Sequence, residues 1–178
     1  MPSNEFIRER TAIGVYGDRR GIDAVHERIH EGIVFNANFA ETLASGSVSS
    51  IMITKPATSD IHLTMSLESS GAGTWTWSKL PNATGGSVIV SNNHKASSTT
   101  VDPMLGGIRS TPTVTSSGTV LEPHVVGSTG VGQTSSGSGG LIRNEWVMDE
   151  TAATKYLIQF TASAATNLSY NITYYKGA

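Results

Sequence analysis

The feature that most constrains the fold of this chain is a two-residue alternation of apolar and polar side chains. The clearest example is residues 59–68, in which the apolar positions are Ile61, Leu63, Met65 and Leu67. Side chains of a β-strand point alternately to the two faces of a sheet, so this pattern predicts strands with one buried face. The alternation recurs in the segments 33–39, 51–53, 74–77, 156–160 and 168–174.

Turn-forming segments separate these predicted strands. Ser, Thr and Gly make up over a third of the chain, and charged residues only 15%. This composition suits strands and turns better than helices. Eight or nine short strands at this spacing predict an all-β fold, and an eight-stranded, jelly-roll-like antiparallel β-sandwich fits the count. The segment 128–140 is so rich in Ser and Gly that we expect a mobile loop there.

Charge divides the chain into an N-terminal extended arm, residues 1–24, and a sandwich domain, residues 25–178. Residues 1–32 carry 11 of the charged side chains, and the other 146 residues carry 15. The arm is nevertheless too apolar for a purely solvated tail. Its apolar side chains are Phe6, Ile7, Ile13, Val15 and Tyr16.

His26, Glu27 and His30 form the H-E-x-x-H pattern of zinc proteases. On a helix, the two histidines would share a face and Glu27 would activate a zinc-bound water, but a third protein ligand is needed. The common extension places that ligand where Asn36 stands, and the nearest downstream carboxylate is Glu41. The predicted helix between Asp23 and Gly32 is only about two turns long. We therefore expect no metal, no cofactor and no catalytic residues.

Other features exclude further classes of function. The net charge of −2 and the absence of a basic patch argue against nucleic-acid binding. The chain has no cysteine, which excludes disulfides and thiolate chemistry. The sequence shows neither a secretory signal nor an apolar run long enough for a membrane span, so we expect a soluble protein made in the cytoplasm. Trp75 and Trp77 fit either a core strand, an interface or a sugar-stacking platform.

Four segments resemble the small β-sandwich decoration, or cement, proteins of tailed-bacteriophage heads. One contains the paired motif E-W-V and T-x-Y-L, carried by Glu145, Trp146, Val147, Thr154, Tyr156 and Leu157. In another, His62 precedes the alternating apolar residues of a strong strand. The segments are HERIHEGIVFNANF (26–39), SDIHLTMSLESSG (59–71), LIRNEWVMDETAATKYLIQFTASA (141–164) and LSYNITYYKG (168–177).

This resemblance implies a structural virion protein without enzymatic activity. Such proteins bind the outer capsid surface and clamp adjacent subunits of the major capsid protein. They usually form symmetric oligomers, so we expect a homotrimer that matches a local three-fold axis. The aromatic residues expected at its interface are Trp75, Trp77, Tyr174 and Tyr175. The alternative is a carbohydrate- or receptor-binding module of a phage fibre or adhesin.

We expect the arm to bind the capsid or a neighbouring copy through Phe6, Ile7, Ile13, Val15 and Tyr16. Ordering an arm costs roughly 1–2 kcal/mol of backbone entropy per residue, so it requires a partner surface. We therefore expect poor order in the isolated protein. The alternative is that the arm packs on its own sandwich as an extra edge strand.

Overall fold

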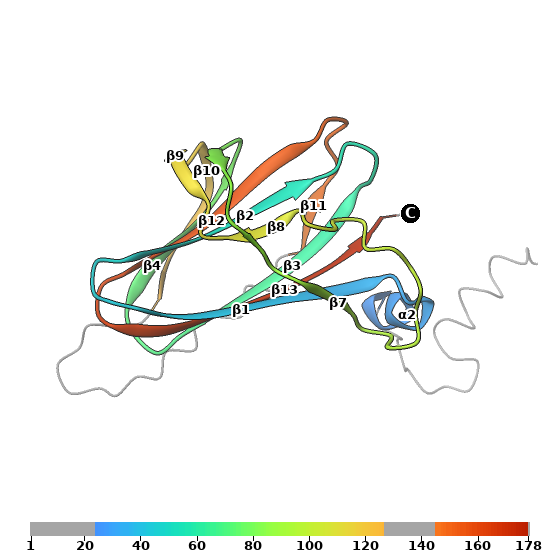
Figure 1. Ribbon diagram of the computed structural model, residues 1–178, viewed down its shortest axis with the longest axis horizontal. Helices are drawn as coiled ribbons and strands as arrows, with labels where there is room; N and C mark the ends of the chain where they lie inside the picture. Colours follow the sequence, from blue (N-terminus) through green and yellow to red (C-terminus); the bar gives the residue numbers. More distant parts are fainter. Residues whose placement is uncertain (1–23, 127–144, 178) are drawn as a thin grey trace, which may run out of the picture.

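The computed structural model describes residues 24–126 and 145–177. Figure 1 shows a β-sandwich with a short helix at one end. The described elements are α2 (Ala24–Glu31), β1 (Val34–Leu43), β2 (Val48–Lys55), β3 (Ile61–Ser69), β4 (Gly73–Lys79), β5 (Asn82–Thr84), β6 (Ser87–Val88), β7 (Ser91–Asn93), β8 (Ile108–Ser110), β9 (Thr113–Ser116), β10 (Thr119–Val126), β11 (Trp146–Met148), β12 (Thr154–Ala162) and β13 (Thr166–Lys176).

The strand order is that of a jelly roll. One sheet has the order β11-β3-β13-β1-β7 and the other the order β10-β4-β12-β2-β8-β6. Numbered one to eight along the chain, the principal strands β1, β2, β3, β4, β10, β11, β12 and β13 give sheets 6-3-8-1 and 5-4-7-2. These are the two interleaved Greek keys of the double-sheet jelly roll. The predicted all-β, jelly-roll-like antiparallel sandwich is confirmed.

The apolar residues predicted from alternation fill the space between the sheets. Ile61, Leu63, Met65 and Leu67 of β3 are all at most 4% exposed, as are the alternate residues from Leu168 to Tyr174 in β13. The facing sheet supplies Trp75, Trp77, Tyr156, Ile158 and Phe160. Burying aromatic side chains of this size makes the largest single contributions to the core.

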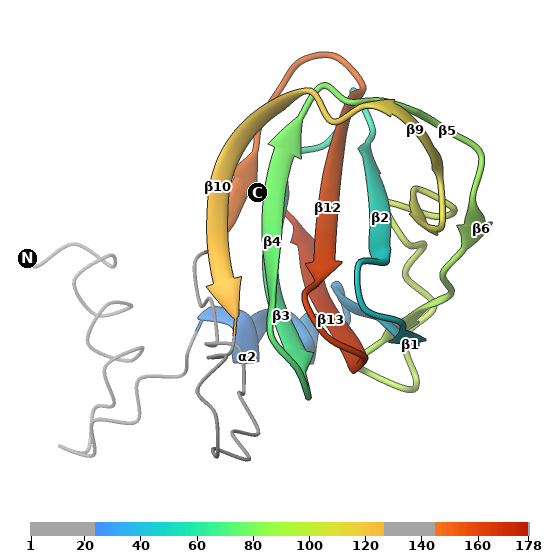
Figure 2. The ribbon, with the colours of Figure 1, turned by 90° about the vertical axis from the view of Figure 1, so that its left-hand side faces the viewer.

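Residues 80–118, here called the insertion, connect β4 to β10 and close one side of the sandwich. Its strand β7 pairs with β1 of the first sheet, and β8 pairs with β2 of the second. Its side chains Ile89, Met104 and Ile108 are buried in the main core. Figure 2 shows β6 on this side and β10 on the opposite side of the sheet that faces the viewer. The insertion therefore bridges the edges of both sheets.

The insertion also covers part of the outer face of the second sheet. Its strands β5 and β9 form a separate two-stranded sheet. Ala83 and Val114 of this pair pack on Met52 and Leu157, which are 4% and 0% exposed. Met52 and Leu157 point away from the main core, so β2 and β12 bury side chains on both faces.

The segment 113–126 contains two consecutive strands that do not pair with each other. Strand β9 pairs with β5, and β10 pairs with β4. Gly118 lies between them with φ of 77°, and a Cβ at this position would lie 2.3 Å from the Lys79 carbonyl oxygen. The turn thus diverts the chain from the insertion into the main sheet at a position that only glycine fits.

Two further predictions concern regions that the structure does not describe. The arm, apart from its final residue, and the loop 128–140 lie outside the described residues. In the part of the chain that the structure describes, no helix is long and apolar enough to span a membrane.

Candidate functional site

Four side chains meet where the helix joins the sandwich, and we call them the junction cluster: Arg28, His62, Glu145 and Tyr175. The Nδ1 atom of His62 lies 2.7 Å from Oε1 of Glu145. The hydroxyl of Tyr175 donates to the same carboxylate oxygen at 2.5 Å. The His62 and Tyr175 rings stack with centroids 4.9 Å apart, and the Arg28 guanidinium lies 5.8 Å from the centroid of the Tyr175 ring.

The cluster joins elements that are far apart in the sequence. Arg28 belongs to α2, His62 to β3 and Tyr175 to β13, while Glu145 directly precedes β11. Backbone pairing sets this geometry, because His62 lies opposite both Tyr175 and Val147 in the sheet. The cluster therefore fastens the helix and the edge strand β11 to the centre of one sheet.

The Glu145 carboxylate is the electrostatic centre of the cluster. The hydrogen bond from Tyr175 lowers the pKa of Glu145, and the hydrogen bond and charge of His62 lower it further, although partial burial opposes both. Glu145 is therefore ionised at neutral pH, and the Nδ1–H of His62 donates to it. The side chain of His62 is 28% exposed and that of Glu145 is 42% exposed, so solvent screens the attraction between them.

The two ring nitrogens of His62 have different surroundings. The Nδ1 atom is engaged by Glu145. The Nε2 atom lies on the side of Gly177, where a Cβ added to that glycine would be 3.4 Å from it. Gly177 is held there because its N–H donates to the Asp60 carbonyl at 2.8 Å.

The junction cluster was not predicted from the sequence. The sequence identifies His62 only as the residue that precedes the alternating apolar positions of a strand, and Glu145 only as part of a motif. Their contact spans 83 positions and is set by sheet pairing, so no local pattern reports it. The available signal was the resemblance: each of its four segments contributes one member of the cluster.

The H-E-x-x-H residues lie on α2, a helix of eight residues, as the two-turn prediction required. Gly32 ends it with φ of 74°, and its N–H donates to the Ile29 carbonyl at 2.9 Å. Glu41 lies near the far end of β1, where its carboxylate accepts a hydrogen bond from Ser49, so it is about 20 Å of strand away from the helix. No group of three potential metal-ligating side chains occurs among the described residues.

The aromatic residues predicted at an oligomer interface lie inside the single chain. Trp75, Trp77 and Tyr174 are 2%, 0% and 0% exposed, and Tyr175 is 8% exposed. Trp77 stacks on Tyr156, and the Tyr174 hydroxyl donates to the Asp102 carboxylate and lies 2.7 Å from Oγ of Ser91. These positions do not fit the predicted interface, because the side chains have almost no surface to offer a partner. The sugar-stacking platform of Trp75 and Trp77 is wrong for the same reason.

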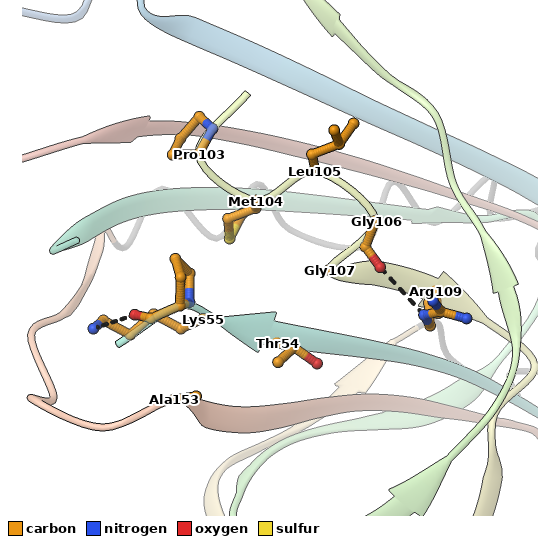
Figure 3. Close-up of a pocket in the computed structure, with 10 residues that line it drawn as sticks. Thr54, Lys55, Pro103, Met104, Leu105, Gly106, Gly107, Arg109 and Ala153 are labelled. Atoms are coloured by element: carbon orange, nitrogen blue, oxygen red, sulfur yellow. Dashed lines mark hydrogen bonds between the residues drawn. The ribbon is translucent and has the colours of Figure 1, made fainter. Parts of the chain in front are cut away.

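A pocket of 360 Å³ lies between residues 103–107 of the insertion and the end of β2. Figure 3 shows Lys55 and Arg109 at opposite ends of it. The buried Lys55 ammonium donates to the carbonyls of Pro56 and Glu150, and Arg109 donates to those of Gly106 and Gly86. Both cations therefore hold neighbouring loops together, and the pocket walls depend on them.

The insertion binds the end of the helix and also carries exposed apolar residues. Three side chains of the insertion bind the C-terminal end of α2: Lys95 donates to the His30 carbonyl, and Asn93 and Ser98 donate to the Gly32 carbonyl. Val90 and Val101 lie only three residues to either side of this segment and are 73% and 78% exposed.

The predicted binding residues of the arm, Phe6, Ile7, Ile13, Val15 and Tyr16, lie outside the described residues. The structure places only the C-terminal end of the arm, at Ala24, where α2 begins. Neither a protein-family model nor a curated protein sequence matches this chain.

Proposed function

We propose that this chain is a structural decoration protein of a tailed-phage head, without enzymatic activity. In this proposal it binds the outer capsid surface and clamps adjacent subunits of the major capsid protein. The observation that carries the proposal is the junction cluster. The four segments that resemble the decoration proteins are distant in sequence, yet each supplies one side chain to this contact. A shared local structure at the arm junction accounts for their resemblance.

The geometry of the junction supports a role in transmitting force. A clamp must pass the load on its binding segment to a rigid body. Here the helix that follows the arm is fixed to the sandwich on two sides, by Arg28 over Tyr175 and by the insertion at Gly32. Beyond the junction, β13 pairs with β1 over ten residues and with β3 over nine. A pull on the arm would therefore be distributed over one continuous sheet.

The surface beside the junction supports docking of this end against another protein. Val90 and Val101 are exposed and flank, in the sequence, the insertion segment 93–98 that binds the end of α2. Apolar surface of this kind stabilises association when a partner covers it. In the proposal, the arm adds Phe6, Ile7, Ile13, Val15 and Tyr16 to the same contact. Many copies on one shell would then convert a modest affinity for each copy into strong overall retention.

Truncation tests the proposal directly. Protein lacking residues 1–20 should keep its melting temperature and lose binding to undecorated phage heads in a co-sedimentation assay. The point variants Val90→Arg and Val101→Arg should weaken binding without unfolding, because each places a charge in the contact. Thr161→Arg is the matched control, since Thr161 is exposed on the outer face of the second sheet.

Two outcomes would contradict the proposal. The first is full occupancy of heads by the truncated protein, which would remove the arm from the contact. The second is stoichiometric zinc in the purified protein that is lost in His26→Ala, which would indicate a hydrolase instead. Cryo-electron microscopy of heads with and without the bound protein would then locate the contact.

A further inference from the structure

The pocket between the turn 103–107 and the end of β2 is bordered by positively charged side chains. Lys55 and Arg109 line it at opposite ends. Lys155 flanks it, because strand pairing places this residue directly opposite Thr54, which is another lining residue. The lining residues include no aspartate and no glutamate. The walls of the pocket therefore carry charge of one sign only.

The three cations at the pocket donate hydrogen bonds only to backbone carbonyls. None of them forms an ion pair in the part of the chain that the structure describes, whereas Arg28 and Lys79 do. A carbonyl accepts a hydrogen bond but does not neutralise a charge, and a cation as buried as Lys55, which is 0% exposed, is normally paired. The acceptors are the carbonyl oxygens of Pro56, Ala83, Gly86, Gly106 and Glu150.

The carboxylates that are nearest in the sequence are directed elsewhere. Asp102 precedes the turn 103–107, but its carboxylate accepts a hydrogen bond of 2.9 Å from the Tyr174 hydroxyl. The Glu150 carboxylate forms an ion pair with Lys79. Neither side chain lines the pocket. An anion in the pocket would thus lie near the three cations without contacting a group of its own charge.

Hydrogen-bond donors remain for a ligand at the Arg109 end of the pocket. A guanidinium has five N–H groups, and that of Arg109 makes two hydrogen bonds with described residues, each of 3.2 Å, so three N–H groups remain. The Thr54 hydroxyl also lines the pocket and makes no hydrogen bond with a described residue. The planar guanidinium matches the geometry of a carboxylate, which can accept from both groups.

The remaining walls of the pocket are largely apolar. Figure 3 shows the turn 103–107 on one side and the end of β2 with Thr54 on the other. Leu105 in this turn is 79% exposed, so a ligand can contact its side chain. A ligand that fills the pocket therefore needs an apolar part beside its charged group. The apolar lining residues are Pro56, Pro103, Met104, Leu105 and Ala153.

The turn is fixed against β2 by its own backbone. The Gly107 carbonyl accepts a hydrogen bond of 2.8 Å from the Thr54 N–H, and the Gly107 N–H donates to the Met104 carbonyl at 2.7 Å. A Cβ on Gly107 would lie 2.7 Å from the Thr54 carbonyl oxygen, so only glycine fits this close approach. The pocket is therefore formed before a ligand binds, which lowers the entropy that binding costs.

We propose that this pocket binds a carboxylate that carries a short apolar chain. Arg109 and the Thr54 hydroxyl bind the carboxylate oxygens, and Leu105 contacts the apolar chain. Lys55 is fully buried and does not touch the ligand, so it and Lys155 act by placing positive charge nearby. The volume of 360 Å³ is at the lower end for ligand pockets and suits a small acid. The proposal does not depend on binding to a capsid.

Solution NMR of the full-length, nitrogen-15-labelled protein tests the proposal with sodium butyrate as the probe. Butyrate should shift the amide signals of Gly106 and Gly107 saturably, with a dissociation constant of roughly 1 mM. Gly46, in the turn between β1 and β2, should not respond. Acetate should bind several-fold more weakly, because it lacks the methylenes that the apolar walls bury. Neutral butyramide and an equal concentration of sodium chloride should leave these signals in place.

Two variants test the assigned contacts. Arg109→Gln should weaken butyrate binding by at least about tenfold, the usual effect of losing a hydrogen bond to a charged group. Arg109 also holds the turn, so Thr54→Val supplies a second test that keeps the side-chain shape and removes only the hydroxyl. It should weaken binding several-fold. Lys176→Gln, which removes an exposed cation outside the pocket, is the matched control and should bind as the wild type does.

A blocked glutamate, N-acetylglutamate amide, identifies the source of the carboxylate. If it binds as tightly as butyrate, the pocket accepts a glutamate side chain of a partner protein. If only butyrate binds, the ligand is a free acid, and either result supports a carboxylate site. The proposal is overturned if butyrate leaves the Gly106 and Gly107 signals unchanged, or if butyramide shifts them equally. It is also overturned if Arg109→Gln and Thr54→Val both retain the wild-type affinity.

Discussion

The hydroxyl of Tyr170 in β13 donates a hydrogen bond of 3.0 Å to Oγ of Ser49 in β2. This contact joins the two sheets across the core, and Ser49 in turn donates to the Glu41 carboxylate in β1. Tyr170 and Ser49 are 0% and 1% exposed, and burial raises the pKa of Tyr170. The Tyr170 hydroxyl therefore depends on Ser49 for its hydrogen bond inside the core, and Ser49 links it to the Glu41 carboxylate.

Tyr170→Phe should destabilise the protein by about 1–2 kcal/mol, because Ser49 loses a buried partner. For a chain of this size, each kcal/mol lowers the melting temperature by roughly 2–4 °C. Urea unfolding of Tyr170→Phe, Ser49→Ala and the double variant would measure the coupling. The double variant should cost less than the sum of the two single variants. Strict additivity would show that the hydrogen bond contributes nothing.

Glu145→Gln should make stability less dependent on pH. The pKa of Glu145 in the folded chain lies below the ordinary value of a glutamate side chain, mainly because of the Tyr175 hydrogen bond. A carboxyl with a lowered folded pKa stabilises the protein above its unfolded pKa, and this contribution is lost as the pH falls through the folded value. The loss at pH 7 should be about 0.2–1 kcal/mol, since the pair is partly exposed.

Urea titrations of wild type and Glu145→Gln at several pH values would test this. The stability difference should be present at pH 7 and should shrink as the pH falls below 4.5. Glu68→Gln, an exposed carboxylate change on the same β3 strand, is the control. A difference that stays constant across this range would contradict a role for the ionised carboxylate.

Gly118→Ala should destabilise the protein much more than Gly46→Ala. Both glycines have positive φ, 77° and 79°, so alanine is strained at either position by about 1–2 kcal/mol. A Cβ on Gly118 would also lie 2.3 Å from the Lys79 carbonyl oxygen, whereas nothing lies within 4 Å of one on Gly46. The clash should add at least about 2 kcal/mol. Equal melting temperatures for the two variants would contradict the prediction, because they would show that the turn at Gly118 shifts to accommodate the added methyl group.

Trp75→Ala should behave as a core substitution. We expect a loss of about 3–5 kcal/mol, the usual cost of removing a buried aromatic side chain. The measurement is the urea midpoint of full-length protein at two protein concentrations. Val90→Ala, at a side chain that is 73% exposed, should change stability by less than about 0.5 kcal/mol. A stable Trp75→Ala variant that lost glycan binding would restore the carbohydrate-binding alternative.

The sequence predicted the strands whose two faces differ most. Ile61 to Leu67 and Leu168 to Tyr174 alternate strictly because one face meets the core and the other meets solvent. Alternation cannot identify the partner of a strand, so it does not show that β9 pairs with β5 and β10 with β4. It also cannot show that Met52 and Leu157 are buried on the second face, because the strands covering them come from the irregular insertion.

The candidate site was less predictable than the fold. Alternation placed Trp75 and Trp77 on one face, but the same pattern arises whether that face meets a core or a partner. The contact between His62 and Glu145 depends on the position of β11 at the sheet edge, which follows from the whole jelly-roll topology. The central outer positions of β1, β3 and β13 carry no charge except Glu68, but they are spread over three segments of the sequence, so this depletion becomes apparent only after the strands are placed side by side.

The pairing of β1 with β13 has a consequence for how the protein is made. Val34 lies opposite Tyr175, so β1 meets its long partner strand 141 positions later in the sequence. At about 5–20 residues per second, roughly 7–30 s separate the synthesis of these two residues. The first sheet is completed only after β13 has emerged, and such non-local pairing makes folding slow. Nascent chains are therefore most vulnerable to aggregation just before β13 emerges, and overproduction should benefit from slower translation or added chaperones.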